Sequence, residues 1–186
     1  MRRNGVKIMW GLLRLLRPLG HIMFLCILFG MCGYFCAIAI TVLAANLLLI
    51  PLDLSPWSFS FSTCSLVMLI CAVARAILRY GEQTCGHYIA FKLLAVIRDR
   101  VFGALRKLAP AKLEGHGRGN LISLLTSDIE LLEVFYAHTI APVCIAVLVS
   151  LTMTVFIGGF HLGLGLFAAV SYFLVGCVIP LASSRI

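Results

Sequence analysis

Long apolar runs are the feature that most constrains how this chain can fold. They make up most of four predicted spans, at about residues 20–50, 57–80, 128–157 and 163–182, and a transmembrane helix needs ~20 predominantly apolar residues. The chain is 62% hydrophobic and 12% charged, whereas a soluble domain is about half apolar and about one quarter charged. The sequence therefore predicts an all-α membrane protein with four long transmembrane helices whose outer surfaces contact the lipid bilayer.

The basic residues predict which side of the membrane each end of the chain occupies. Five Lys and Arg residues precede the first run, nine lie between Arg75 and Arg118, and the last is Arg185. Because the two outer turns contain none, the positive-inside rule places both termini of this multi-pass protein in the cytosol, with the cell membrane as its expected location. The net charge of +8 does not indicate a nucleic-acid partner, since the basic residues flank apolar runs and form no face of a soluble module.

The first residues allow two interpretations. Residues 8–19, IMWGLLRLLRPL, are amphipathic, and Trp10 suits the headgroup zone. They fit an elbow helix lying on the inner leaflet, so that residues 1–19 form a cytosolic N-terminus and residues 20–186 the membrane domain. They fit equally well a cytosolic extension of the first transmembrane helix.

The second apolar run leads into a helical pattern that continues far beyond a membrane span. No proline interrupts the chain from residue 57 to Pro110, and apolar residues recur at helical spacing among charged ones. One stripe comprises Tyr88, Phe91, Leu94, Ile97, Val101 and Leu105. The residues from about 81 to 110 lie beyond the expected span. At ~1.5 Å per residue, these roughly 30 residues reach ~45 Å beyond the membrane. We therefore expect a transmembrane helix over 57–80 with a cytosolic extension to 110.

The following polar stretch, EGHGRGNLISLLTSDIELLEVFY, predicts a short helix between two long ones. Three glycines break the incoming helix, and Asn120 can cap a helix over residues 119–127. Ser127 and Glu130 form a capping box for the returning helix. The short helix has four large apolar side chains, at Leu121, Ile122, Leu124 and Leu125. A plain hairpin turn does not need them, so we expect them to contact a partner.

The pattern G-N-L-I-S-L-L-T-S-D, from Gly119 to Asp128, resembles the first intracellular loop of type I ABC exporters. The similarity extends upstream and downstream of this loop, over about residues 75–142. Within this range the sequence looks like the thiol-exporter branch of the family, which is tied to cytochrome bd assembly. It is carried by Arg79-Tyr80-x-Glu82, Phe91-Lys92-Leu93-Leu94, Arg98, Val101-Phe102, Leu105, Leu108-x-Pro110, Asp128-Ile129, Leu132, Tyr136 and Ile140-x-Pro142.

The resemblance implies the permease portion of an ATP-driven exporter. Residues 119–127 would be a coupling helix, contacting a separate ATPase domain through Gly119, Asn120, Leu121, Ile122, Leu124, Leu125 and Asp128. A second transporter half would be the other protein partner, and ATP with Mg²⁺ would bind on the ATPase domain. The solute would be small, such as a thiol, an amino acid or a peptide.

The chain departs from the family pattern in three ways. Leu124 replaces the usual Arg of the loop. Four spans are predicted where the family has six, and no G-x-x-x-x-G-K-[ST] motif is present to hold ATP phosphates. We therefore expect no intrinsic catalysis and no cofactor in this chain, which looks like the N-terminal part of an exporter half. The alternative is a stand-alone four-helix membrane scaffold or regulatory remnant without transport activity.

Arg75, Arg79 and Glu82 share one helical face because of their i, i+4 and i+3 spacing. They are the candidate substrate-pathway residues, forming an entrance that attracts an anionic solute. The competing interpretation is an Arg79–Glu82 ion pair with Arg75 reaching toward the headgroups.

The cysteines and histidines carry a weaker metal or haem hypothesis. Cys85 and His87 supply only two ligands, and the eight cysteines lie mostly within apolar runs without zinc-type spacing. Packing between helices explains them more simply, so no metal site is expected. A redox or haem protein would instead show a visible absorption band.

Overall fold

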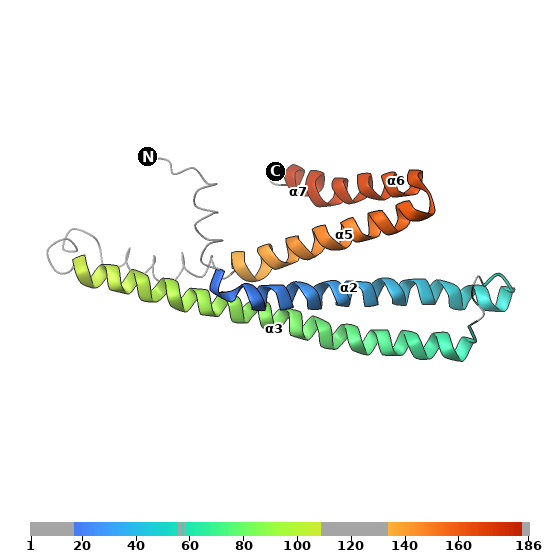
Figure 1. Ribbon diagram of the computed structural model, residues 1–186, viewed down its shortest axis with the longest axis horizontal. Coiled ribbons are helices and arrows are strands. Elements are labelled where there is room, and N and C mark those ends of the chain that lie inside the picture. Colours follow the sequence, from blue (N-terminus) through green and yellow to red (C-terminus); the bar gives the residue numbers. More distant parts are fainter. Residues whose placement is uncertain (1–16, 56, 58, 109–133, 184–186) are drawn as a thin grey trace. The chain divides into compact units, whose positions relative to one another are not determined.

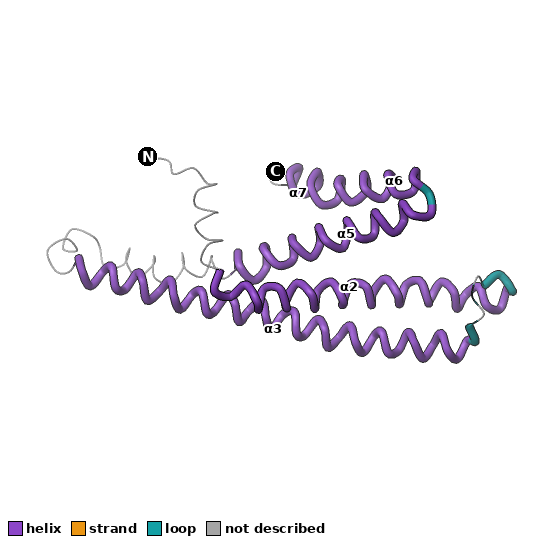
Figure 2. Tube along the Cα trace, viewed as in Figure 1, coloured by secondary structure: helices purple, strands orange, loops and turns teal. Residues whose placement is uncertain are grey.

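The computed structural model describes residues 17–55, 57, 59–108 and 134–183, and among them it contains helices and turns but no strand. Figures 1 and 2 show these helices, with short connections between α2 (Gly20–Leu49) and α3 (Phe61–Leu108) and between α5 (Ala141–Phe160) and α6 (Leu162–Phe173). Four helical segments of the described part are long and apolar enough to cross a membrane: Arg17–Leu52, Phe61–Ala104, Ala137–Phe160 and Leu162–Ser183. The predicted all-α membrane fold is confirmed. The chain forms two units, one ending at Pro142 and one beginning at Val143, which are described separately.

The first unit is built on a hairpin of two long helices. A short 3₁₀ turn, η1 (Arg17–Leu19), leads into α2 (Gly20–Leu49), and η2 (Ile50–Leu52) ends that helix. Pro51 and the left-handed Asp53, with φ of 54°, direct the chain away from the helix axis. The second helix, α3 (Phe61–Leu108), then returns alongside α2 (Figure 1).

A glycine allows the two long helices to approach closely. A Cβ atom at Gly81 of α3 would lie 2.8 Å from Cδ2 of Phe29 on α2. The Phe29 ring therefore occupies space that any larger residue at position 81 would need. Small residues bring transmembrane helices together in this way, because lipid provides no hydrophobic force between them.

A polar network joins the hairpin near its turn. Asn46 is buried in α2, where its Nδ2 donates to Cys64 Sγ at 3.4 Å and its Oδ1 lies 2.9 Å from the Ser55 hydroxyl. The same hydroxyl lies 2.7 Å from the Trp57 carbonyl oxygen and can donate to one acceptor at a time. Because lipid cannot satisfy a buried amide, these partners account for Asn46 in an otherwise apolar helix.

The second half of α3 packs mainly through residues outside the apolar stripe that the sequence indicates, although Leu94, Ile97 and Val101 of that stripe are half-buried. Tyr88 and Phe91 are exposed, whereas Ile89 and Leu93 are fully buried. The buried cluster joins the start of α2, α3 and the short π-helix η3 (Tyr136–Ile140). Its members are Leu19, Ile89, Ala90, Leu93 and Ala137, with Ile22, Met23, Phe135 and Ile140 packed against it. Tyr88 and Phe91 are consequently available to lipid or to a partner.

Prolines coincide with two π-helical turns. Pro142 lies in α5 (Ala141–Phe160) two residues after η3, and Pro180 lies in α7 (Ile179–Ser183) two residues after η4 (Leu174–Val178). Proline lacks an N–H and crowds the preceding turn, so the helix widens locally and continues.

The second unit contains a tight helical hairpin. α5 extends through Gly158 and Gly159 to Phe160, and α6 (Leu162–Phe173) follows after His161 alone. The interval between the two predicted spans, residues 158–162, is thus mostly helical in the structure. His161 caps α6, because its Nδ1 accepts from the Gly163 N–H at 3.1 Å. A Cβ at Gly165 would lie 2.6 Å from the Gly158 Cα, so close backbone packing explains these glycines.

Candidate functional site: a charged pocket between the two long helices

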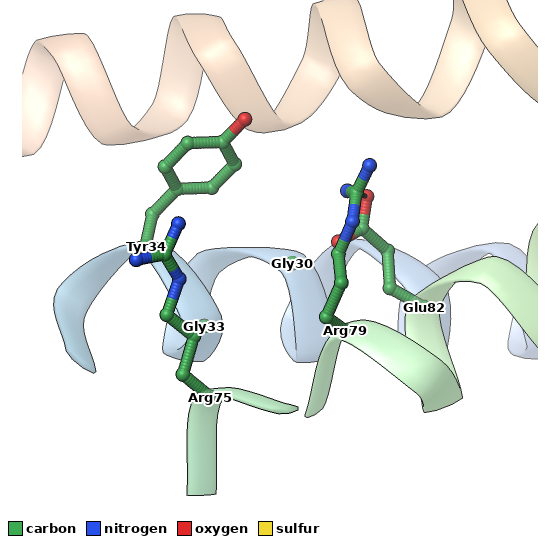
Figure 3. A pocket seen from close by; sticks show the side chains of 6 residues that line it. All are labelled: Gly30, Gly33, Tyr34, Arg75, Arg79 and Glu82. Atoms are coloured by element: carbon green, nitrogen blue, oxygen red, sulfur yellow. Dashed lines mark hydrogen bonds and ion pairs between the residues drawn. The ribbon is translucent and has the colours of Figure 1, made fainter. Parts of the chain in front are cut away.

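A pocket of about 200 Å³ lies in the first unit between α2 and α3. α3 contributes the three charged side chains, and α2 contributes two glycines and a tyrosine. Figure 3 shows the lining residues Gly30, Gly33, Tyr34, Arg75, Arg79 and Glu82. Their spacing on α3 places all three charged residues on the face toward α2. The structure therefore brings the three predicted pathway residues together in one pocket.

An ion pair occupies one end of this pocket. Arg79 Nη1 lies 2.6 Å from Glu82 Oε1, and the Glu82 side chain is 8% exposed while that of Arg79 is 54% exposed. The predicted Arg79–Glu82 pair is confirmed. A buried carboxylate without a cation would be strongly destabilising, so Arg79 compensates a charge that the fold encloses.

Arg75 occupies the other end of the pocket. In Figure 3 it lies toward Tyr34, away from the Arg79–Glu82 pair. Among the described residues, no carboxylate lies within ion-pair distance of Arg75. Its charge is therefore not compensated by the side chains that line the pocket.

Hydrogen bonding also fixes the backbone of α3 beside the pocket. The buried Cys26 of α2 donates its thiol hydrogen to the Glu82 carbonyl oxygen at 3.3 Å. All eight cysteines are free, and Cys26 acts here as a small apolar side chain with a weak donor. This contact holds α2 against α3 at the level of the ion pair.

His87 has aromatic neighbours on two elements. Its ring centroid lies 6.0 Å from that of Phe91 on α3 and 5.5 Å from that of His138 on η3. Within the described ranges, no group of three His, Cys, Asp or Glu side chains is placed to hold a metal ion. The arrangement thus shows ring packing around His87, and the Cys85–His87 pair gains no third metal ligand there.

The lining residues from α2 were not predicted. Gly30, Gly33 and Tyr34 lie in an apolar run whose sequence gives no sign of a polar pocket. The available signal was the two small residues Gly30 and Gly33 within one apolar run, because small residues are enriched where membrane helices pack closely.

The predicted coupling helix lies outside the described residues. This applies to Gly119, Asn120, Leu121, Ile122, Leu124, Leu125 and Asp128, and also to the capping residues Ser127 and Glu130. Their role stays a prediction. The structure does describe the helix that leads to them, since α3 is continuous to Leu108.

Comparison with known proteins identifies the class to which this membrane fold belongs. Residues 23–184 match the family model of the ABC transporter transmembrane region. Because this match covers most of the sequence, the chain belongs to that family and is the membrane part of an ABC transporter.

Individual relatives place the chain more narrowly. A probable ABC transporter ATP-binding/permease protein of Haemophilus influenzae is 46% identical over 186 residues, which are 100% of this chain and 34% of that protein. The glutathione/L-cysteine transport system ATP-binding/permease protein CydC of the same organism is 32% identical over 84 residues, or 45% of this chain and 15% of that protein. CydD of the corresponding Bacillus subtilis system is 27% identical over 111 residues, or 60% of this chain and 19% of that protein.

The chain therefore spans about one third of the length of the first of these relatives. Their names combine an ATP-binding part with a permease part, and this chain corresponds to permease sequence. The resemblance to ABC exporters and to the thiol-exporter branch is confirmed at the level of the family and its relatives.

Proposed function

We propose that this chain is the permease portion of an ATP-driven exporter that moves a small solute out of the cytosol. The continuous α3 helix is the observation that carries the proposal. Its 48 residues span about 72 Å, whereas the hydrocarbon core is ~30 Å thick. A helix that only crosses the membrane does not need the additional 40 Å or so, but a helix that delivers a contact to a cytosolic domain does.

The proposed organisation follows from this length and from the charge distribution. The second span covers about residues 57–80, with α3 beginning at Phe61. The helix continues into the cytosol, and residues 119–127 form the coupling helix at its far end. The returning span covers about residues 128–157 and the last span about 163–182. The positive-inside pattern supports cytosolic termini in the cell membrane.

The proposed partners complete the transport machinery. An ATPase domain binds ATP with Mg²⁺ and contacts residues 119–127, and a second transporter half encloses the solute pathway. The ATP-binding/permease names of the relatives support an ATPase partner. The large apolar side chains exposed on α3, among them Leu66, Leu69, Ile70, Val73 and Ile77, provide surface for lipid or for the second half.

The proposed solute is a small thiol, amino acid or peptide. Support comes from the glutathione/L-cysteine systems named among the relatives and from the charged pocket on α3. Arg75, Arg79 and Glu82 are the proposed pathway residues, because charged groups within transmembrane helices characteristically line solute paths.

A proline substitution tests the coupling-helix claim directly. The full chain is co-expressed with the ATP-binding part of the Haemophilus influenzae relative, and co-purification from solubilised membranes is measured. Leu121→Pro should abolish this association, because a proline within a helix costs about 3 kcal/mol or more.

Leu162→Pro is the matched control. Leu162 is the first residue of α6 and follows the extended His161, a position that tolerates proline. The control should retain the association. Equal association of the Leu121→Pro variant and the parent chain would contradict the proposed coupling helix.

A further inference from the structure

The pocket between α2 and α3 has an excess of one positive charge. Arg75 and Arg79 provide two positive charges and Glu82 one negative charge. Because Glu82 pairs with Arg79 at 2.6 Å, the excess charge belongs to Arg75. Arg75 is exposed, and its guanidinium, which has no carboxylate partner among the described residues, is free to bind an anion.

The pocket is also small, which restricts the ligand. Its volume of about 200 Å³ is below the range of ~300–1,000 Å³ that is typical of sites for drug-sized molecules. Gly30 and Gly33 form part of its wall without side chains, and Tyr34 brings a phenolic hydroxyl from α2. Arg75 therefore supplies the N–H donors of a site of limited size, and the Tyr34 side chain lies next to it (Figure 3).

The geometry points to a binding site for a small solute that carries one net negative charge on a carboxylate, held by Arg75 in the pocket that Tyr34 also lines. A guanidinium group presents two parallel N–H donors that match a carboxylate. A single negative charge neutralises the pocket, whereas a phosphate monoester carries about −1.5 to −2 and would leave an excess. The Arg79–Glu82 pair bounds the other end and keeps Arg79 from competing for the carboxylate.

This inference rests on the proposed function, since it treats the pocket as part of the solute pathway. It specifies the charge and the recognition group of the solute, and it separates the roles of the two arginines. Arg75 contacts the solute, whereas Arg79 keeps Glu82 in place.

The experiment measures equilibrium binding to the full chain in phosphatidylcholine nanodiscs without nucleotide. Isothermal titration calorimetry compares N-acetyl-L-cysteine, which carries one negative charge, with its neutral carboxamide of almost identical size. The acid should bind about tenfold or more tightly than the amide, as expected for a charge-assisted hydrogen bond.

Substitutions assign this preference to Arg75. In Arg75→Gln, the acid should lose its advantage of about tenfold, while binding of the amide stays unchanged and shows that the pocket is still folded. Arg100→Gln, at an exposed position on α3 outside the pocket, is the matched control and should retain the full preference.

Several results would overturn the inference. They are equal or absent binding of acid and amide, a preference for the acid that persists in Arg75→Gln, and Arg75-dependent displacement of the acid by short-chain phosphatidylglycerol. The last result would assign Arg75 to lipid headgroups. Because no ATPase takes part, failure of ATP-driven transport in a separate assay would refute the proposed function but not this binding site.

Discussion

Replacing Arg79 with glutamine is expected to destabilise the α2–α3 hairpin more than replacing its ion-pair partner Glu82. The two side chains differ in exposure, 54% for Arg79 and 8% for Glu82. Arg79→Gln leaves a buried carboxylate without a cation. Glu82→Gln leaves a guanidinium group that already reaches the surface of the chain.

The expected magnitudes follow from this asymmetry. Removing one partner of a fully buried ion pair costs about 3–5 kcal/mol, whereas an exposed pair contributes at most about 1 kcal/mol. Since only the carboxylate is buried, Arg79→Gln should cost about 2 kcal/mol and Glu82→Gln less than about 1 kcal/mol. The double variant contains neither charge of the pair and should recover more than half of the loss caused by Arg79→Gln.

Reversible unfolding of the full chain in mixed micelles, followed by far-ultraviolet circular dichroism, gives the four free energies of this cycle. Arg100→Gln serves as the exposed control on the same helix and should change the free energy of unfolding by no more than about 0.5 kcal/mol. A larger loss for Glu82→Gln than for Arg79→Gln would refute the reasoning, as would additive losses in the double variant.

Three further substitutions test the packing by the same unfolding titration. Gly81→Leu should cost about 1–3 kcal/mol, because its Cβ would lie 2.8 Å from the Phe29 ring, and Phe29→Ala in the same chain should cost less than it does alone. Asn46→Ala should cost about 0.6–2 kcal/mol through the loss of its two side-chain hydrogen bonds. Gly165→Ala should cost about 1–3 kcal/mol, because its Cβ would meet the Gly158 backbone at 2.6 Å; a stability equal to that of the parent would contradict each assignment.

The helical class was predictable because lipid leaves a spanning chain few alternatives. Each backbone N–H and C=O in the bilayer must be paired within the protein, so apolar runs of this length form helices. The continuity of α3 could also be predicted from the sequence, since no proline occurs between its first residue and Leu108. Local sequence therefore determined these elements.

The end of α5 and the buried face of α3 depend on tertiary packing and could not be predicted from the sequence. Gly158 and Gly159 are typical of a turn, yet α5 continues through them because Gly165 packs closely against Gly158. Helical periodicity likewise identifies an apolar stripe on α3, but it does not distinguish a face that contacts lipid from one that packs. The buried residues proved to be Ile89 and Leu93.

The candidate site was predictable only on the helix that carries its charges. The i, i+3 spacing of Arg79 and Glu82 was sufficient to predict their ion pair. Tyr34 is more than forty positions away from Arg75 along the chain, so its place in the pocket depends on the register of α2 against α3. That register is set by tertiary contacts such as the one between Phe29 and Gly81.

A chimeric transporter provides the most direct test of the central claim that this chain is the membrane part of an ATP-driven exporter. The chain replaces the corresponding third of the Haemophilus influenzae relative, with which it shares 46% identity along its whole length. ATP-dependent accumulation of labelled glutathione or L-cysteine is then measured in inside-out vesicles. The account predicts accumulation that requires ATP and is lost in Leu121→Pro. ATP hydrolysis without accumulation of either solute, or accumulation that persists in Leu121→Pro, would contradict it.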